Sequence, residues 1–243
     1  MFQSEVAYDN FMGRFSRRLA PVFADFAGVE PSQRVLDVGA GTGALTTELV
    51  RRGTEVAAAE PSSAFVEALR GRFPGVDVRE AGAERLPWPD ESFDVALAQL
   101  VVSFMSDARA GLAEMERVVR PGGTIAACMW DRTGMEMLAA IDRTRDALGA
   151  ARKDDPYRTR EGFTALVGED ARIEQLEVEA SYVDFDDFWT ALLGGAGPAG
   201  AWAQSLDDEQ RTAARAELYR QLGEPEGSFA LVGRAWAARI TRG

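Results

Sequence analysis

Short apolar runs alternate with amphipathic stretches over residues 34–130 of this 243-residue chain, and this alternation limits its fold more than any other feature. Strands separated by helices of this length are typical of βαβ units, which build a parallel sheet with helices on both faces. The pattern therefore predicts an α/β chain with a three-layer, doubly wound sheet. The runs that predict strands are Arg34–Val38, Glu55–Ala59, Val76–Arg79, Asp94–Leu100 and Thr124–Met129, and those that predict helices are Gly43–Arg52, Ser62–Arg72 and Asp107–Val119.

The segments on either side of this alternation predict further helices and two late strands. Apolar residues recur at three- and four-residue steps through the first thirty residues, which predicts a helix there. After Trp130 we expect helices at 135–148, 185–193 and 207–222, strands at 172–182 and 228–240, an exposed loop at 152–160 and a flexible turn at 194–200. No linker divides the chain, so we expect a single domain over residues 1–243.

The chain contains no histidine and a single cysteine, Cys128. These counts exclude Ser-His-Asp catalysis, histidine-ligated zinc and cysteine-cluster metal sites, and we expect no metal. A lone cysteine cannot form an intrachain disulfide, which suits a reducing compartment such as the cytoplasm. No apolar run approaches the ~20 residues that cross a bilayer, and the acidic first residues lack the apolar segment of a secretory signal, so we expect neither feature.

The charge balance argues against a nucleic-acid partner. The 27 basic and 39 acidic residues give a formal net charge of −12. A phosphate backbone would be repelled by that charge. We therefore expect the partners of this chain to be small molecules.

A glycine-rich turn, in the run VLDVGAGTG at residues 35–43, follows the first predicted strand. Glycines let backbone N–H groups approach a ligand, and the N-terminus of the following helix favours an anion such as a carboxylate or phosphate. Glu60, at the end of the second predicted strand, is placed to accept hydrogen bonds from a ribose diol. Asp37 lies inside a buried strand, which costs free energy unless a ligand ammonium or the N–H groups of the turn bind it. Since the turn also satisfies the dinucleotide pattern G-x-G-x-x-G/A, it leaves a nicotinamide cofactor open.

Sequence motifs follow one another in a recognisable order along residues 34–130. VLDVGAGTG is followed by Glu60, then by AERLPWPD at 83–90 with Ser92-Phe93-Asp94, and then by VVRPGG at 118–123. In this order they resemble motif I, the second-strand acid, the "AExLPFPDxSFD" stretch and the "LRPGG" turn of class I S-adenosylmethionine (SAM)-dependent methyltransferases, in the ubiquinone/menaquinone-biosynthesis-like (type 11) group. Residues 8–16 also resemble the lid segment of some bacterial members.

The resemblance implies a Rossmann-like methyltransferase fold, with seven strands in the order 3-2-1-4-5-7-6 and the last strand antiparallel. It implies SAM as the cofactor, S-adenosylhomocysteine as its product, and no metal. It divides the chain into a helical lid at 1–30, a cofactor-binding core at 31–130 and an acceptor-side elaboration at 131–243. It places the methionine end at Asp37, Gly39, Ala40 and Gly41, the ribose at Glu60, the next helix start at Pro61 and Ser62, the adenine at Ala83 and Glu84, and further cofactor contacts at Gln99 and Leu100.

One position departs from the family pattern. Many relatives carry an acidic residue just before the Ala83-Glu84 pair, where it accepts a hydrogen bond from the adenine amino group. This chain has Gly82 there. We therefore expect the adenine contact to move to Glu84 or to the backbone.

Residues outside the core are candidates for roles near the reaction. Arg14 is a candidate to clamp the methionine carboxylate through two hydrogen bonds, although an exposed arginine is more often a solvated charge. Tyr8 is a candidate to close over the methionine chain. Without histidine, a general base would have to be a carboxylate such as Asp131, or Tyr8.

Other polar and aromatic residues favour structural roles. Trp88 is typical of a loop aromatic packed under prolines. The three aspartates at 184, 186 and 187 are typical of charges at the start of a helix, where the dipole favours them. The aromatic residues at helical spacing favour core positions over the roof of a pocket. They are Phe185, Phe188, Trp189 and Trp202.

The expected reaction is direct displacement of the SAM methyl group by a nucleophilic atom of a small-molecule acceptor, and we expect a monomer or homodimer. The absence of histidine favours acceptors that ionise easily, such as phenols, acids or amines. Two alternatives remain open at this stage. One is a nicotinamide-dependent oxidoreductase, and the other is a domain that binds SAM without catalysis.

Overall fold

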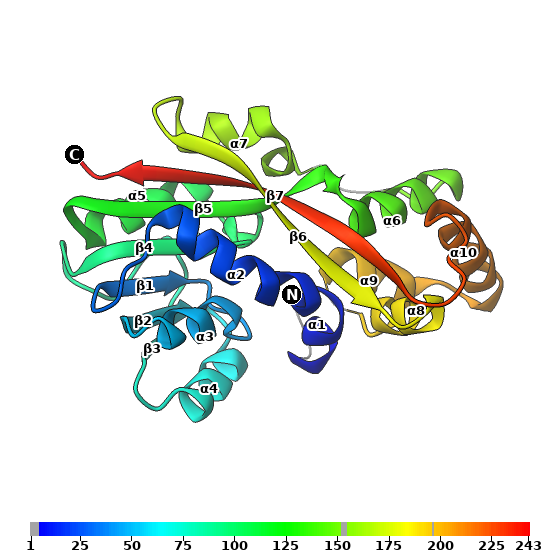
Figure 1. Ribbon diagram of the computed structural model, residues 1–243, viewed down its shortest axis with the longest axis horizontal. Coiled ribbons are helices and arrows are strands. Elements are labelled where there is room, and N and C mark those ends of the chain that lie inside the picture. Colours follow the sequence, from blue (N-terminus) through cyan, green and yellow to red (C-terminus); the bar gives the residue numbers. More distant parts are fainter. Residues whose placement is uncertain (1–4, 152–154, 196) are drawn as a thin grey trace. The chain divides into compact units, whose positions relative to one another are not determined.

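Strands of the computed structural model, which describes residues 5–151, 155–195 and 197–243, form one seven-stranded mixed sheet. They are β1 (Arg34–Val38), β2 (Glu55–Glu60), β3 (Asp77–Glu80), β4 (Phe93–Gln99), β5 (Val119–Met135), β6 (Arg172–Tyr182) and β7 (Phe229–Thr241). Their order is β3-β2-β1-β4-β5-β7-β6, which confirms the predicted fold. The pairs among β1 to β5 are parallel, whereas Figure 1 shows β7 running against β5 and β6.

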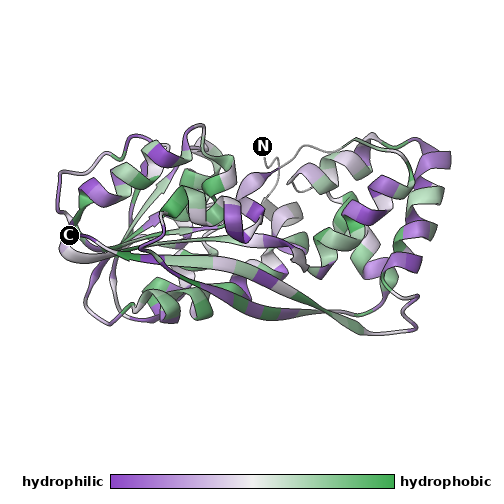
Figure 2. Cartoon of the chain, turned by 90° about the horizontal axis from the view of Figure 1, so that it is seen from above, coloured by the Kyte–Doolittle hydropathy of each residue, from purple (hydrophilic) through white to green (hydrophobic). Residues whose placement is uncertain are grey.

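Helices connect these strands, and Figure 2 shows both apolar and polar residues along them. They are α1 (Glu5–Phe11), α2 (Gly13–Ala27), α3 (Ala44–Arg51), α4 (Ser63–Arg72), α5 (Ala108–Val118), α6 (Glu136–Ala147), α7 (Arg160–Val167), α8 (Phe185–Leu193), α9 (Gly197–Ser205) and α10 (Asp208–Gln221), with 3-10 turns η1 (Val102–Phe104) and η2 (Pro156–Arg158). The helix predicted over the first thirty residues is two helices, and residues 1–4 lie outside the described ranges. No described helix is long and apolar enough to span a membrane.

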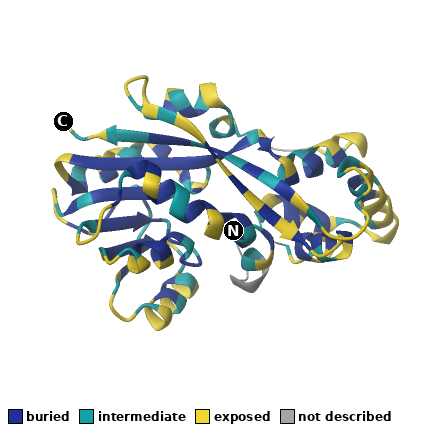
Figure 3. Ribbon diagram, in the orientation of Figure 1, coloured by how far each residue is buried: buried dark blue, intermediate teal, exposed yellow. Residues whose placement is uncertain are grey.

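The parallel strands bury apolar residues on both faces. Leu36 of β1 and Ala57 of β2 belong to one apolar cluster, which also contains residues of α5 and α7. Ala58 belongs to a second cluster with Val66 and Leu69 of α4. Since neighbouring residues of a strand point to opposite faces, the two clusters are the two sides of the sheet. The central strands are accordingly dark blue in Figure 3, so a polar side chain within them is withdrawn from water.

The fifth strand is longer than predicted. It begins at Val119 rather than Thr124 and continues to Met135. The segment 120–123, which we expected to form a turn before the strand, is instead an irregularity within it. Phe93 of β4 pairs with Val119, whereas Val95 already pairs with Thr124. The strand pairing therefore resumes on the far side of the Pro-Gly-Gly segment, as it does across a bulge.

Two helices correct the predicted loops. The expected exposed loop at 152–160, of which 152–154 lie outside the described residues, leads through η2 into α7, whose N-cap is Thr159. Its side chain accepts a hydrogen bond from the backbone N–H of Gly162. The expected flexible turn at 194–200 contains the start of α9, because Pro198 suits the first turn of a helix and the following turn buries Trp202.

The chain divides into two compact units, and each takes three separate segments. The unit that we call the sheet unit comprises Leu19–Trp130, Asp155–Leu176 and Ala235–Gly243. The unit that we call the helical unit comprises Met1–Arg18, Asp131–Asp154 and Glu177–Arg234. This division does not test the prediction of a single domain, which stays a prediction.

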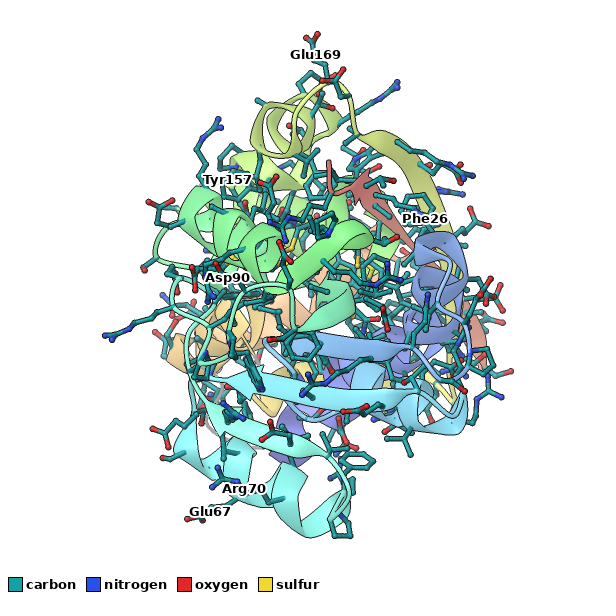
Figure 4. All side chains as sticks on the ribbon, turned by 90° about the vertical axis from the view of Figure 1, so that its left-hand side faces the viewer. Phe26, Glu67, Arg70, Asp90, Tyr157 and Glu169 are labelled. Carbon is teal, nitrogen blue, oxygen red and sulfur yellow. The ribbon has the colours of Figure 1, made fainter. Side chains whose placement is uncertain are left out.

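Each unit has its own buried interior and a polar surface. In the helical unit the ring of Tyr182 stacks on Phe229 at 5.3 Å between centroids and meets Phe188 edge-on at 5.1 Å. In the sheet unit the acidic side chains of Glu67 and Glu169 point away from the ribbon (Figure 4). The aromatic residues predicted for the core are buried, as the prediction requires. They are Phe185, Phe188, Trp189 and Trp202.

Candidate functional site

The glycine turn after β1 has a backbone that only glycine adopts easily. Gly39, Gly41 and Gly43 have φ angles of 73°, 54° and 82°. A Cβ at Gly39 would collide with the side chain of Val101, and one at Gly43 would lie 2.8 Å from Leu69. A Cβ at Gly41, by contrast, would meet no atom closer than 3.9 Å. Packing thus requires the first and third glycines, while the middle one leaves space through which a ligand can approach the backbone.

Glu60 ties this turn to the next helix. It is the last residue of β2 and is 6% exposed. Its Oε2 accepts a hydrogen bond from the N–H of Gly41 and its Oε1 accepts one from the N–H of Ser62, both at 2.9 Å. Burial raises the pKa of Glu60, and these two hydrogen bonds oppose that rise. Each carboxylate oxygen keeps a lone pair for another donor.

Asp37 is a second buried carboxylate beside the turn. It is 1% exposed, and its Oδ2 accepts a hydrogen bond of 2.6 Å from the hydroxyl of Thr46 on α3. Burial and, to a lesser extent, the nearby charge of Glu60 raise the pKa of Asp37 to about 7, against the hydrogen bond from Thr46. The structure gives neither carboxylate an ion pair with an arginine or lysine among the residues that it describes. A cation supplied by a ligand would therefore find two carboxylates that no side-chain cation has neutralised.

Glu84 lies beside the position at which the family pattern is broken. Its Oε1 accepts hydrogen bonds from the N–H and hydroxyl of Ser106, at 2.6 and 2.8 Å, and from the N–H of Asp107 at 3.2 Å. Burial opposes ionisation of Glu84, but these hydrogen bonds lower its pKa overall. A Cβ at Gly82 would lie 2.9 Å from the other oxygen, Oε2. An ionised carboxylate oxygen thus faces the place that Gly82 leaves empty of a side chain.

The remaining candidates of the core occupy strand and helix ends in the same unit. Ala40 is buried and donates its N–H to the carbonyl of Ala59 at 3.1 Å. Gln99 ends β4, and the buried Leu100 after it donates its N–H to the carbonyl of Cys128 at 2.9 Å. The structure therefore brings the core candidates to the carboxyl ends of adjacent parallel strands in the sheet unit. They are Asp37, Gly39, Ala40, Gly41, Glu60, Pro61, Ser62, Ala83, Glu84, Gln99 and Leu100.

Arg14 belongs to the helical unit and is already bound to a carboxylate. Its guanidinium donates two hydrogen bonds to Asp187, at 2.7 and 2.5 Å, and lies 4.8 Å from the ring centre of Tyr182. The hydrogen bond from Arg14 lowers the pKa of Asp187. Arg14 is thus neither a solvated surface charge nor free to bind a ligand without leaving Asp187.

Tyr8 and Asp131 also lie in the helical unit. Tyr8 is half-buried on α1. Asp131 is 8% exposed within β5, and its Oδ1 accepts hydrogen bonds from the N–H and hydroxyl of Thr133 at 3.1 and 3.2 Å. The side chain of Asp131 is therefore held by hydrogen bonds from a residue of the same strand.

The sequence did not reveal which neighbours fix these groups. Thr46 holds Asp37 and Val101 abuts Gly39, and no motif marks either one. Helical periodicity is a signal that could have placed Thr46 on the buried face of α3. Trp88 has the structural role predicted for it, because its indole N–H donates to Asp77 at 2.9 Å and its ring packs edge-on against Phe93.

The chain is similar in sequence to known methyltransferases over part of its length. Residues 36–127 match the family described as "Methyltransferase domain". An uncharacterised methyltransferase of Mycobacterium bovis is 38% identical over 139 residues, which are 56% of this chain and 55% of the relative. A demethylmenaquinone methyltransferase of a Mycobacterium species (strain KMS) is 42% identical over 101 residues, 42% of this chain and 43% of the relative. The chain thus spans about half the length of the curated relatives that it matches.

A solved structure resembles nearly the whole chain. It is that of a candidate type II methyltransferase from Anaeromyxobacter dehalogenans, with a TM-score of 0.68 and 24% identity over 93% of this chain and 95% of the other. At this identity the likeness shows the fold alone.

Proposed function

We propose that this chain transfers the methyl group of SAM to a small-molecule acceptor, since residues 36–127 match the methyltransferase domain family. The observation that carries the proposal is the buried carboxylate of Glu60, held at the end of β2 against the glycine turn. A carboxylate at this place in a parallel sheet is suited to accept hydrogen bonds from both hydroxyls of a ribose. The SAM product would be S-adenosylhomocysteine.

The residues of the sheet unit fit the cofactor chemically. The space over Gly41 admits a ligand to the backbone of the turn, and the buried Asp37, once ionised, offers a negative charge to an ammonium group. The Oε2 of Glu84, which faces Gly82, is suited to accept a hydrogen bond from an adenine amino group. Ala40, Pro61, Ser62, Ala83, Gln99 and Leu100 complete the proposed cofactor contacts.

SAM supplies a methyl group made electrophilic by its positively charged sulfur. The task of the chain is then to bind and orient the two reactants, and alignment of this kind can lower a barrier by ~7–11 kcal/mol. We assign proton acceptance from the acceptor to Asp131 or Tyr8, since the chain has no histidine. We also assign Arg14 to the methionine carboxylate, a role that requires its guanidinium to leave Asp187. No metal is part of this proposal.

We further propose that the chain works in the cytoplasm as a monomer or homodimer and has no nucleic-acid partner. The net charge of −12 supports the last point, and the lone cysteine supports a reducing compartment. A menaquinone-type acceptor is one hypothesis for the substrate of this chain, because a relative that matches part of it is a demethylmenaquinone methyltransferase.

Calorimetric titration of SAM into the wild type and Glu60→Ala tests the proposal. Loss of two hydrogen bonds to a charged group is expected to weaken binding about 100-fold or more. Glu60→Gln keeps one acceptor oxygen and is expected to fall between the two. The matched control is Glu80→Ala, an exposed carboxylate that pairs with Glu60 in the neighbouring strand and whose loss should change affinity less than about threefold.

Each competing function predicts a different result. Unchanged affinity in Glu60→Ala removes Glu60 from the ribose role. Thermal stabilisation by NAD and not by SAM favours the oxidoreductase. Binding of SAM and S-adenosylhomocysteine without turnover of any acceptor in a screen of phenols, acids and amines favours a non-catalytic domain.

A further inference from the structure

Leu100 has a backbone conformation that is unusual for its residue type and for its place. Four described residues other than glycine have positive φ angles: Ser32 at 67°, Glu91 at 58°, Leu100 at 63° and Glu224 at 55°. Ser32, Glu91 and Glu224 are exposed, where a turn can relax around them. Leu100 is 7% exposed and directly follows β4. A branched side chain is disfavoured in this region of conformational space, so the surrounding structure must hold it there.

The neighbouring strands supply that restraint. The N–H of Leu100 donates to the carbonyl of Cys128 in β5, at 2.9 Å. On the other side, β4 pairs in parallel with β1, with Leu97 opposite Asp37. The residue that leaves β4 is therefore fixed between the strand that carries the glycine turn and the next strand of the sheet.

The reversed backbone at Leu100 directs the next residue onto the glycine turn. The Cγ2 of Val101 lies so close to Gly39 that no Cβ fits between them. An extended conformation at Leu100 would continue the strand direction and would turn Val101 away from this contact. The free energy that the positive φ of Leu100 costs is thus coupled to one contact, the packing of Val101 on Gly39.

We propose that Leu100 is a positioning residue whose left-handed backbone holds Val101 against Gly39, and thereby fixes the turn that receives the amino-acid end of SAM. This inference rests on the proposed function. It assigns no chemical step to Leu100. It states that strain at the end of β4 is retained because it shapes the part of the site that binds the methionine group.

The pair Leu100→Ala and Leu100→Gly isolates the backbone effect, since both lack the leucine side chain and only glycine relaxes at positive φ. Glycine ordinarily lowers stability relative to alanine. Here we expect the opposite order, with the melting temperature of Leu100→Gly about 2–4 °C above that of Leu100→Ala. Despite its greater stability, Leu100→Gly should bind SAM about 5- to 10-fold more weakly than Leu100→Ala in calorimetric titration.

The exposed turn at Glu91 provides the matched control. Its φ of 58° should give the same stability order for Glu91→Gly and Glu91→Ala. These two variants should bind SAM equally within twofold, because Glu91 precedes the first residue of β4, whereas Leu100 follows the last one. Adenosine, which lacks the amino-acid end, should bind Leu100→Gly and Leu100→Ala equally within twofold.

The outcomes separate this inference from the proposed function. If the wild type does not bind SAM, the proposed function fails. If it binds and the two Leu100 variants have equal affinities, or if adenosine binding falls as much as SAM binding, the positioning role is overturned while the function stands. A lower melting temperature for Leu100→Gly than for Leu100→Ala shows that no strain exists.

Val101→Ala keeps the inference testable if the Leu100 variants do not fold. This change removes the methyl groups that face Gly39 and leaves the backbone of Leu100 intact. We expect SAM affinity to fall about fivefold and adenosine affinity to stay within twofold. Unchanged SAM affinity in Val101→Ala would overturn the inference.

Discussion

Carboxylates at the glycine turn and at the start of α8 lie in opposite electrostatic surroundings. In the sheet unit, Asp37 and Glu60 are buried and accept hydrogen bonds from a hydroxyl and from backbone N–H groups. In the helical unit, the side chain of Asp187 is 26% exposed and forms a bidentate ion pair with Arg14. A carboxylate that forms an ion pair with an arginine of its own chain needs no ligand to neutralise it. Two buried carboxylates without such an ion pair are instead best stabilised by a positively charged ligand.

The two regions should therefore respond to pH in opposite directions. Burial raises the pKa of Asp37 to about 7, while the hydrogen bond from Arg14 lowers the pKa of Asp187 below its ordinary value of 3.8. Acidification from neutral pH should remove the free-energy cost of burying an ionised Asp37, and it should weaken the ion pair between Asp187 and Arg14.

The largest expected effect is that of Asp37→Asn. The folded protein holds a proton on Asp37 up to about pH 7, whereas the unfolded chain loses it near 3.8, so the stability contributed by this group falls as pH rises between the two values. About three pKa units correspond to about 4 kcal/mol. The variant, which never ionises here, should be more stable than the wild type at pH 8 by up to that amount.

Urea denaturation at pH 5 and pH 8 measures this difference. The gain from Asp37→Asn should be clearly smaller at pH 5, and an equal gain at both values would show that the carboxylate is not strained by burial. In the same variant SAM should bind more weakly, because the charge that meets its ammonium group is gone. Tighter SAM binding by Asp37→Asn would contradict the view that Asp37, unlike Asp187, is stabilised by a positively charged ligand.

A smaller and opposite effect is expected for Asp187→Asn. Loss of two charge-assisted hydrogen bonds at a partly exposed site should cost about 1–2 kcal/mol at pH 7. Because the pKa of Asp187 is lowered, this stability is present above about pH 4 and is lost as pH falls below it. The wild type and the variant should thus converge in urea denaturation as the solution is acidified.

Asp186→Asn is the control for Asp187. Asp186 also meets an arginine, Arg215, but its side chain is 75% exposed. Its loss should change the free energy of unfolding by less than about 0.5 kcal/mol. Equal losses at the two aspartates would show that burial does not distinguish them.

The smallest effect is the response to salt. In 1 M NaCl the difference between the wild type and Asp187→Asn should shrink by a few tenths of a kcal/mol, since partly exposed ion pairs are screened. The difference between the wild type and Asp37→Asn at pH 8 should persist, because a buried charge is screened much less. Equal sensitivity to salt would remove the distinction that burial makes between them.

The regular part of the sheet unit could be predicted from sequence because local signals agree there. The strands β1, β2 and β4 are short apolar runs, and the helices α3, α4 and α5 that come after them carry buried residues. The length of β5 could not be predicted in this way, since the composition of 120–123 is that of a turn. The pairing of Val119 and Thr124 with β4 on either side of this segment places it within the strand. The start of α9 could not be predicted either, because the glycines of 194–200 are typical of a turn.

The candidate site divides along similar lines. The positions of Asp37 and Glu60 follow from the pattern of strand ends, because parallel strands bring those ends to one edge. The pairing of Arg14 with Asp187 could not be inferred, since 173 positions separate the two residues and no sequence pattern links them. Likewise the conformation of Leu100 could not be predicted from its residue type, because leucine ordinarily avoids positive φ angles.

The burial of Cys128 has a practical consequence for spectroscopy. The thiol is fully enclosed within β5, and burial raises its pKa, so maleimide reagents should not reach it in the native state. A second cysteine introduced at Val183, a residue that is 74% exposed, can then accept a fluorophore without removal of the natural one. The N–H of Val183 donates to Asp187, so such a dye would report optically on the ion pair with Arg14 while cofactor is titrated.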